Sequence, residues 1–225
     1  MCYTARMFVF HPTSPGRRLH RRHLLCLALA GAVIPRLAEA IAPPDPAAPI
    51  AALYTALEAL MRLATDMPFR QRFHRIAPVI DRTLDLQTIL RSSIGTRWTT
   101  LDAATQAALH RAFRRFTIAT YVANFDKYDG ERFELSPTFR QIGAEQVVQS
   151  HIIQGNGEPI RLDYVMRQTD AGWRAVDILL DGAISRVAVQ HSDFRAVLQD
   201  GGATALIASL EHKTANLAGD GMLDS

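Results

Sequence analysis

Hydrophobic positions recur every three or four residues through the first half of the chain, which is the spacing of helices that bury one face. The first such run predicts a helix from Ile50, and two shorter helices follow before Gly95. Thr99-x-x-Asp102 resembles a capping box, so a long helix is predicted from there to about Tyr128. The apolar stripe of this long helix comprises Leu109, Ala112, Phe113, Phe116, Ala119, Thr120 and Ala123.

After Gly130 the pattern changes to β-rich runs in which apolar and polar positions partly alternate. Gly155-Asn156-Gly157 is typical of a hairpin turn, and helices return from about Ile184. Helices, then antiparallel strands, then helices again predict an α+β fold. We expect about four strands, at Arg132–Ser136, Gln146–Gln154, Ile160–Thr169 and Trp173–Leu180.

Strand alternation assigns side chains to the two faces of this sheet. It places Asp163 on the opposite face from Leu162 and Tyr164. The apolar face is predicted to contain Leu162, Tyr164 and Met166 from the third strand, and Val176, Ile178 and Leu180 from the fourth.

The first forty residues have the three parts of a secretory signal peptide. Basic residues that include Arg21-Arg22 precede an apolar run from Leu24 to Ile34, which is too short to span a bilayer. An Ala38-Glu39-Ala40 cleavage pattern follows. Residues 1–40 are therefore predicted to direct export to the periplasm by the Sec route or by a twin-arginine route.

The chain after this segment is predicted to form one domain. A flexible lead-in rich in proline and alanine occupies residues 41–49, the domain occupies residues 50–213, and residues 214–225 form a loose tail. Both cysteines precede residue 41, so the mature chain can form neither a disulfide nor a thiolate metal site.

Basic residues concentrate in the N-terminal segment. The whole chain carries a formal net charge of +3, but residues 1–40 hold six arginines and one acidic residue. From Ile41 onward there are 19 basic and 21 acidic residues. The charge balance therefore gives no reason to expect a nucleic-acid partner.

Signatures of catalysis are absent from the sequence. It has no G-x-S-x-G, P-loop or H-E-x-x-H pattern. Asp177 and Asp181 share a strand face about 13 Å apart, which is too far to share a proton. We therefore predict that the protein is not an enzyme and uses no cofactor. We also predict no metal, because the histidines lack metal-ligand spacing: they are His74, His110, His151, His191 and His212.

Three stretches together resemble a known family. They are the aromatic-rich segment Trp98–Phe133, the segment Trp173–Ser185 with the arginine that follows it, and the segment Gly201–Leu210. They resemble the toluene-tolerance family of periplasmic lipid carriers, whose best-known branch is MlaC. The closest branch is HpnM, which is associated with hopanoid biosynthesis, and the similarity covers roughly residues 50–213.

The resemblance implies a cone-shaped α+β fold with an apolar cavity between the helices and a curved antiparallel sheet. It implies a soluble shuttle that carries a membrane lipid, with a hopanoid as the predicted cargo and a phospholipid as the other candidate. The implied partners are membrane-embedded transporter components, such as an ABC transporter, that serve the outer membrane. Together with the helix stripe and the strand faces, it predicts a cavity lined by Phe113, Phe116, Tyr121, Phe125, Val147, Leu162, Tyr164, Met166, Val176 and Ile178.

Two other functions stay open at this point. Cone-shaped α+β folds also host isomerases with a carboxylate in an apolar cavity, and Asp163 would be the candidate residue, although its predicted face opposes this. A cargo-free adaptor of an export complex is the second alternative. Such an adaptor would have a filled core without a cavity.

Overall fold

The computed structural model describes residues 45–64 and 66–219, which belong to one compact unit. The predicted signal peptide, the first residues of the lead-in and the tail from residue 220 lie outside the described residues. The α+β fold predicted from the sequence is confirmed, with five strands in place of about four.

Helices occupy both ends of the described unit. Asp85 and Asp102 each cap a helix by accepting a hydrogen bond from the backbone N–H three residues further on, at 2.9 Å in both cases. Thr99, expected in the cap, instead lies in a short 3₁₀ segment. The helices are α1 (Ala48–Arg62), α2 (Phe69–Thr83), α3 (Leu86–Ile94), η1 (Gly95–Thr100), α4 (Ala103–Asn124) and α5 (Arg186–Ala218).

The long helix α4 ends at Asn124 and not near Tyr128 as predicted. The chain turns after Phe125 and brings the ring of Tyr128 beneath Arg62 of α1, with the guanidinium carbon 3.8 Å from the ring centroid. This cation–π contact is a tertiary interaction, so the local sequence pattern did not reveal it.

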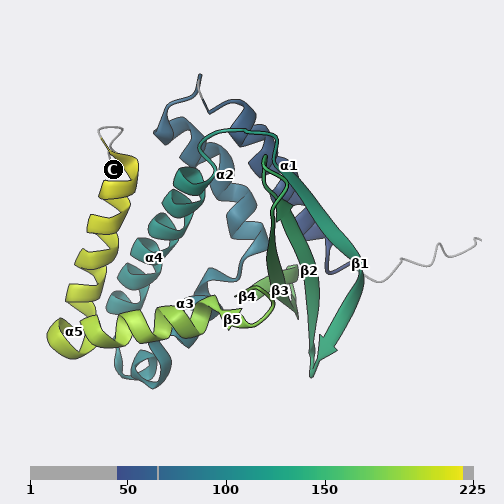
Figure 1. The fold of residues 1–225 in the computed structure, drawn as a ribbon. Helices are drawn as coiled ribbons and strands as arrows, with labels where there is room; N and C mark the ends of the chain where they lie inside the picture. The colour runs from purple at the N-terminus through teal and green to yellow at the C-terminus, as the bar shows by residue number, and fades with distance from the viewer. Residues whose placement is uncertain (1–44, 65, 220–225) are drawn as a thin grey trace, which may run out of the picture. The chain divides into compact units, whose positions relative to one another are not determined.

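Helix α5 has a sharp kink at Gly202, whose φ of 67° lies in the left-handed region that favours glycine. Figure 1 shows the two legs of α5 at a steep angle, with the second leg beside α4. The second leg continues to Ala218, beyond residue 213 where the domain was expected to end. It does so because Thr214 and Ala218 are buried.

The sheet is antiparallel throughout, and its strands follow in chain order, so that β1 and β5 form its edges. The turn between the second and third strands fits closely under a loop. A Cβ placed on Gly155 would lie 1.9 Å from the carbonyl oxygen of Asp129, so only glycine fits there. The strands are β1 (Arg132–Ile142), β2 (Glu145–Ile153), β3 (Pro159–Thr169), β4 (Gly172–Leu180) and β5 (Ile184–Ser185).

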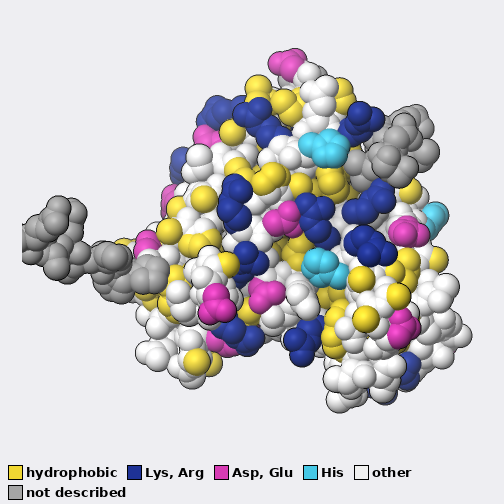
Figure 2. All heavy atoms as spheres, turned by 180° about the vertical axis from the view of Figure 1, so that it is seen from behind, with side chains coloured by type: hydrophobic (Ala, Val, Ile, Leu, Met, Phe, Trp, Pro, Cys, Tyr) yellow, Lys and Arg dark blue, Asp and Glu magenta, His cyan; other side chains and the backbone are white. Residues whose placement is uncertain are grey.

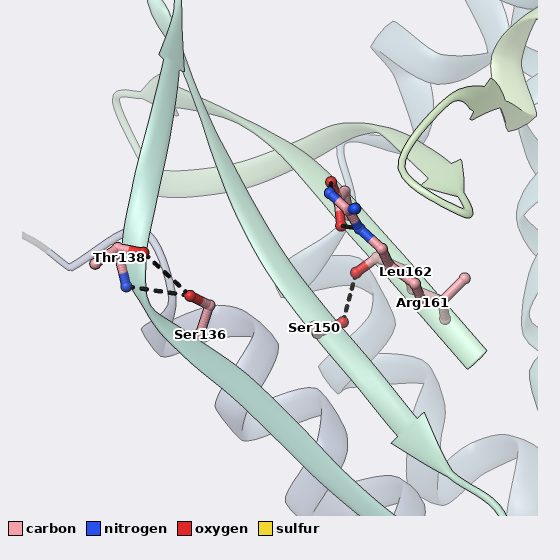
Figure 3. Close-up of polar contacts among 6 residues, drawn as sticks. Ser136, Thr138, Ser150, Arg161 and Leu162 are labelled. Atoms are coloured by element: carbon pink, nitrogen blue, oxygen red, sulfur yellow. Dashed lines mark hydrogen bonds and ion pairs between the residues drawn. The ribbon is translucent and has the colours of Figure 1, made fainter. Parts of the chain in front are cut away.

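Strand β1 is longer than predicted, although its pairing with β2 is irregular between Leu135 and Phe139. Pro137 lies in this irregular stretch, and an edge strand tolerates proline because one side of it needs no donor. Ser136 Oγ accepts a hydrogen bond from the backbone N–H of Thr138 at 3.3 Å, as Figure 3 shows.

The hydrophobic core lies between the helices and the sheet face that carries Val148, Tyr164 and Met166. Tyr54 of α1 reaches this face, where its hydroxyl lies 2.5 Å from Ser150 Oγ. Ser150 Oγ in turn donates to the carbonyl of Leu162 at 2.6 Å (Figure 3). These bonds satisfy polar groups that burial would otherwise leave unpaired. None of the helices in the described residues is both long enough and apolar enough to cross a membrane.

Candidate functional site

A cavity of about 310 Å³ opens between α3, α4, strands β3 and β4, and the start of α5. This volume is at the lower end of the range for small-molecule pockets. The cavity reaches the surface, since exposed Arg186 and Asn124 are part of its wall. The wall is formed by Leu84, Leu86, Ile89, Phe113, Phe116, Thr117, Thr120, Tyr121, Asn124, Phe125, Leu162, Tyr164, Asp177, Ile178, Leu180, Arg186, Val187 and Gln190.

Helix α4 supplies the longest part of the wall. Its cavity-facing residues follow one another at intervals of one or three positions, which places them on one face of the helix. At 1.5 Å per residue, the eleven steps from Phe113 to Asn124 span about 16 Å. The side chains change along this face from aromatic to polar: Phe113, Phe116, Thr117, Thr120, Tyr121 and Asn124.

The first leg of α5 contacts α4 at the Phe113 end of this face. Phe194 meets Phe113 edge to face, with ring centroids 6.2 Å apart. Burial raises the pKa of the Tyr121 hydroxyl, and the positive charge of Arg186, eight residues earlier in α5, lies close enough to oppose part of that rise. The cavity therefore has an aromatic end near Phe113 and a more polar end near Tyr121 and Arg186.

Two tyrosines line the cavity, and a third lies beside them. Burial raises the pKa of Tyr121, of Tyr164 and of Tyr54 above the usual value, because the interior disfavours the charged phenolate. Tyr54 and Tyr164 meet edge to face with ring centroids 6.0 Å apart. All three are therefore neutral hydroxyl groups at neutral pH, and they add no charge to this part of the cavity.

Seven of the ten residues predicted to line the cavity do lie in its wall. The helix stripe located Phe113 and Phe116, and the alternation along β3 located Leu162 and Tyr164, because both periods stay unbroken there. Their contact with a lipid remains a prediction. The seven are Phe113, Phe116, Tyr121, Phe125, Leu162, Tyr164 and Ile178.

The structure places Val147, Met166 and Val176 outside the cavity wall. Val148, not Val147, pairs with Tyr164, so Val147 lies on the other face of the sheet. Val176 falls in a β-bulge, because Val165 pairs with Asp177 while the next residue, Met166, pairs with Ala175.

The bulge at Val176 adds one residue to β4 and reverses the alternation beyond it, so the apolar face does not extend from Ile178 to Val176. Met166 is fully buried in the core near the cavity but does not contribute to its wall.

Sequence reasoning did not identify the residues that α3 and α5 bring to the cavity. Ile89 of α3, Gln190 of α5 and Asn124 of α4 line the cavity but were not predicted to do so. Arg186 was noted only as following a family-like segment. Its position at the start of a helix after β5 was the one signal that could have pointed to a site.

Among the described residues, Asp177 is the one acidic residue that lines the cavity, and its carboxylate has a structural role. Its Oδ1 accepts hydrogen bonds from the backbone N–H of Ile178 at 2.8 Å and of Val187 at 3.1 Å. Its Oδ2 accepts a bond from Ser185 Oγ at 2.5 Å. The carboxylate therefore fixes the start of α5 at the mouth of the cavity.

Asp163, the candidate base of the isomerase alternative, lies on the outer face of the sheet as its parity predicted. It is 1 % exposed, and Arg161 covers it with two hydrogen bonds of 2.9 and 2.7 Å (Figure 3). A carboxylate held in this way does not face the cavity. No group of three or more His, Cys, Asp or Glu within the described part of the chain could hold a metal ion.

Basic charge gathers on the two packed helices α2 and α4. Together they hold seven arginines and one acidic residue, whereas residues 45–219 as a whole hold 19 of each charge. Arg114 and the single acid, Asp81, form a two-pronged ion pair with bonds of 2.7 and 2.6 Å. Figure 2 shows arginine and lysine side chains gathered near the middle of one face of the molecule.

An α+β unit with an apolar cavity between its helices and one sheet face defines a class of proteins that enclose hydrophobic small molecules. Residues 55–212 match the family described as MlaC protein, and the chain belongs to this family. No curated protein matches the chain.

A solved structure has a similar fold. It is the phospholipid-binding protein from Ralstonia solanacearum in complex with a phospholipid, with a TM-score of 0.68. The two chains are 22% identical over 78% of this chain and 99% of the other. At this identity the likeness establishes the shared fold.

Proposed function

We propose that the protein is a periplasmic lipid-binding shuttle, which carries a membrane lipid between membranes or transport components and catalyses no reaction. The observation that carries this proposal is the cavity, whose wall is mostly apolar and aromatic. Membership of the MlaC family and the fold shared with a phospholipid-binding protein support it.

The physical task of such a shuttle is to shelter hydrocarbon from water. Each exposed CH₂ group costs about 0.8 kcal/mol, so a sixteen-carbon chain costs about 12 kcal/mol. A free lipid therefore crosses an aqueous space very slowly. A dry cavity removes most of that cost, and aromatic rings such as those of Phe113, Phe116 and Phe125 provide a wall of this kind.

The finer parts of the proposal concern cargo, partners and export. A hopanoid is the cargo that the resemblance to the HpnM branch favours, and the flat rings of the wall suit a polycyclic lipid. Membrane-embedded transporter components are the proposed partners, and the basic surface of α2 and α4 suits an acidic region on one of them. A signal peptide at residues 1–40 is the proposed route out of the cytoplasm.

Native mass spectrometry of the mature protein, purified from its own compartment and followed by organic extraction, tests this function. A co-purified polycyclic triterpenoid would establish both the carrier and the hopanoid. A diacyl lipid would establish the carrier and replace the cargo. A clean apo mass, with no uptake of any lipid that is offered, would refute the carrier and favour the cargo-free adaptor.

A further inference from the structure

One end of the cavity combines an apolar wall with hydrogen-bond donors that form no hydrogen bond with any residue of the described part of the chain. Arg186 and Gln190 lie four residues apart on the same side of α5, and both line the cavity. Across from them, α4 contributes Tyr121 and Asn124. Arginine, amide and phenol side chains are all donors of hydrogen bonds.

Arg186 differs from several other arginines of the described unit in having no partner. Arg114, Arg161 and Arg167 each form an ion pair with a carboxylate at 2.5–2.7 Å. Within the residues that the structure describes, the side chain of Arg186 makes no hydrogen bond and no ion pair, although Asp177 also lines the cavity. The Asp177 carboxylate is already bound by three donors of its own surroundings.

The hydroxyl of Tyr121 is a second unused donor at this end. It forms no hydrogen bond with a described residue, and burial raises its pKa, so it keeps its proton at neutral pH. Its ring stacks on Phe125, with centroids 6.1 Å apart, which fixes its position beside the mouth.

We propose that Arg186 binds an anionic oxygen group, a phosphate or a carboxylate, on the polar end of the lipid. This inference rests on the proposed carrier function and applies to either lipid skeleton. The hydrocarbon would lie toward Phe113, and the anionic group would lie at the mouth with Tyr121 as an additional donor. Guanidinium groups bind such oxygens with paired, charge-assisted hydrogen bonds.

The test compares two ligands that share one hydrocarbon chain, hexadecyl phosphate and hexadecanol, below their aggregation concentrations. Delipidated mature protein is titrated with each ligand, and dissociation constants are measured by native mass spectrometry and by displacement of the neutral dye Nile red. We expect the phosphate ligand to bind about tenfold more tightly at low salt, which is the effect expected of one charge-assisted contact at a partly exposed mouth.

The variants are Arg186→Gln and, as a matched control, Arg195→Gln, which removes an exposed arginine of the same helix that does not line the cavity. Arg186→Gln should abolish the preference for phosphate without changing the affinity for hexadecanol, and Arg195→Gln should leave both constants unchanged.

Equal binding of the two ligands, or an unchanged preference in Arg186→Gln, would overturn the inference and leave the carrier function standing. Failure of both ligands to bind would refute the carrier function and this inference with it. Displacement of hexadecyl phosphate by millimolar inorganic phosphate would assign the site to a free anion and overturn the lipid assignment.

Discussion

Placing a charge in the cavity wall at Phe116 should remove the lipid without unfolding the protein. Phe116 is only partly buried and lies in the middle of the cavity face of α4, so Phe116→Asp changes the wall more than the core. Lys213 lies 6.0 Å from the centroid of the Phe116 ring, and the short aspartate side chain cannot follow the ring toward it. The new carboxylate would therefore stay in the wall.

The size of the effect follows from desolvation. A buried charge without a partner costs about 3–5 kcal/mol, and this cost arises only when lipid displaces the water around the carboxylate. Because about 1.4 kcal/mol corresponds to a tenfold change, the affinity for lipid should fall by about a hundredfold to several thousandfold. Phe116→Leu, which keeps the wall apolar, should lose far less.

The assay is the ratio of lipid-bound to free protein in native mass spectra, with circular dichroism and the melting temperature as measures of folding. Ala107→Asp is the matched control, because Ala107 is an exposed residue of the same helix that lies outside the cavity wall. A folded Phe116→Asp protein that retains as much lipid as the wild type would show that the lipid does not lie against Phe116.

Three further predictions concern stability. Gly155→Ala should lower the free energy of unfolding by several kcal/mol in urea titrations, because a Cβ there would lie 1.9 Å from the Asp129 carbonyl oxygen. A loss below about 0.5 kcal/mol would contradict this close approach. The pKa of Tyr164 is raised, so the folded state holds the phenol proton more tightly than the unfolded state does, and the free energy of unfolding should be constant below about pH 10 and fall above it. In Tyr164→Phe this fall should be shallower, and an identical slope would show that burial does not raise the pKa of Tyr164. Asp177→Ala should lower the free energy of unfolding, measured by thermal unfolding, by about 1–3 kcal/mol, because donors such as Ser185 Oγ lose their acceptor. Asp177→Asn keeps one acceptor oxygen and should lose less, so equal losses in the two variants would contradict the acceptor role.

The sequence by itself determined the features that depend on an unbroken local period. The stripe of α4 placed Phe113 and Phe116 on the cavity side, because a helix repeats its direction every 3.6 residues. Strict alternation along β3 separated Tyr164 from Asp163 for the same kind of reason. The family resemblance rests partly on the segment that forms α4, and the family match confirms the family.

Only the tertiary structure decided the features that depend on how strands and helices meet. Register put Val148 and not Val147 beside Tyr164, and a bulge removed Val176 from the apolar face. A one-residue shift reverses a strand's faces, and no local pattern fixes that shift. The Asp177 carboxylate holds the start of α5 at the mouth of the cavity and so places Arg186 there, more than sixty residues of chain away from Tyr121. Contacts so distant in sequence leave no local periodicity, which is why the polar end of the site emerged only from the folded chain.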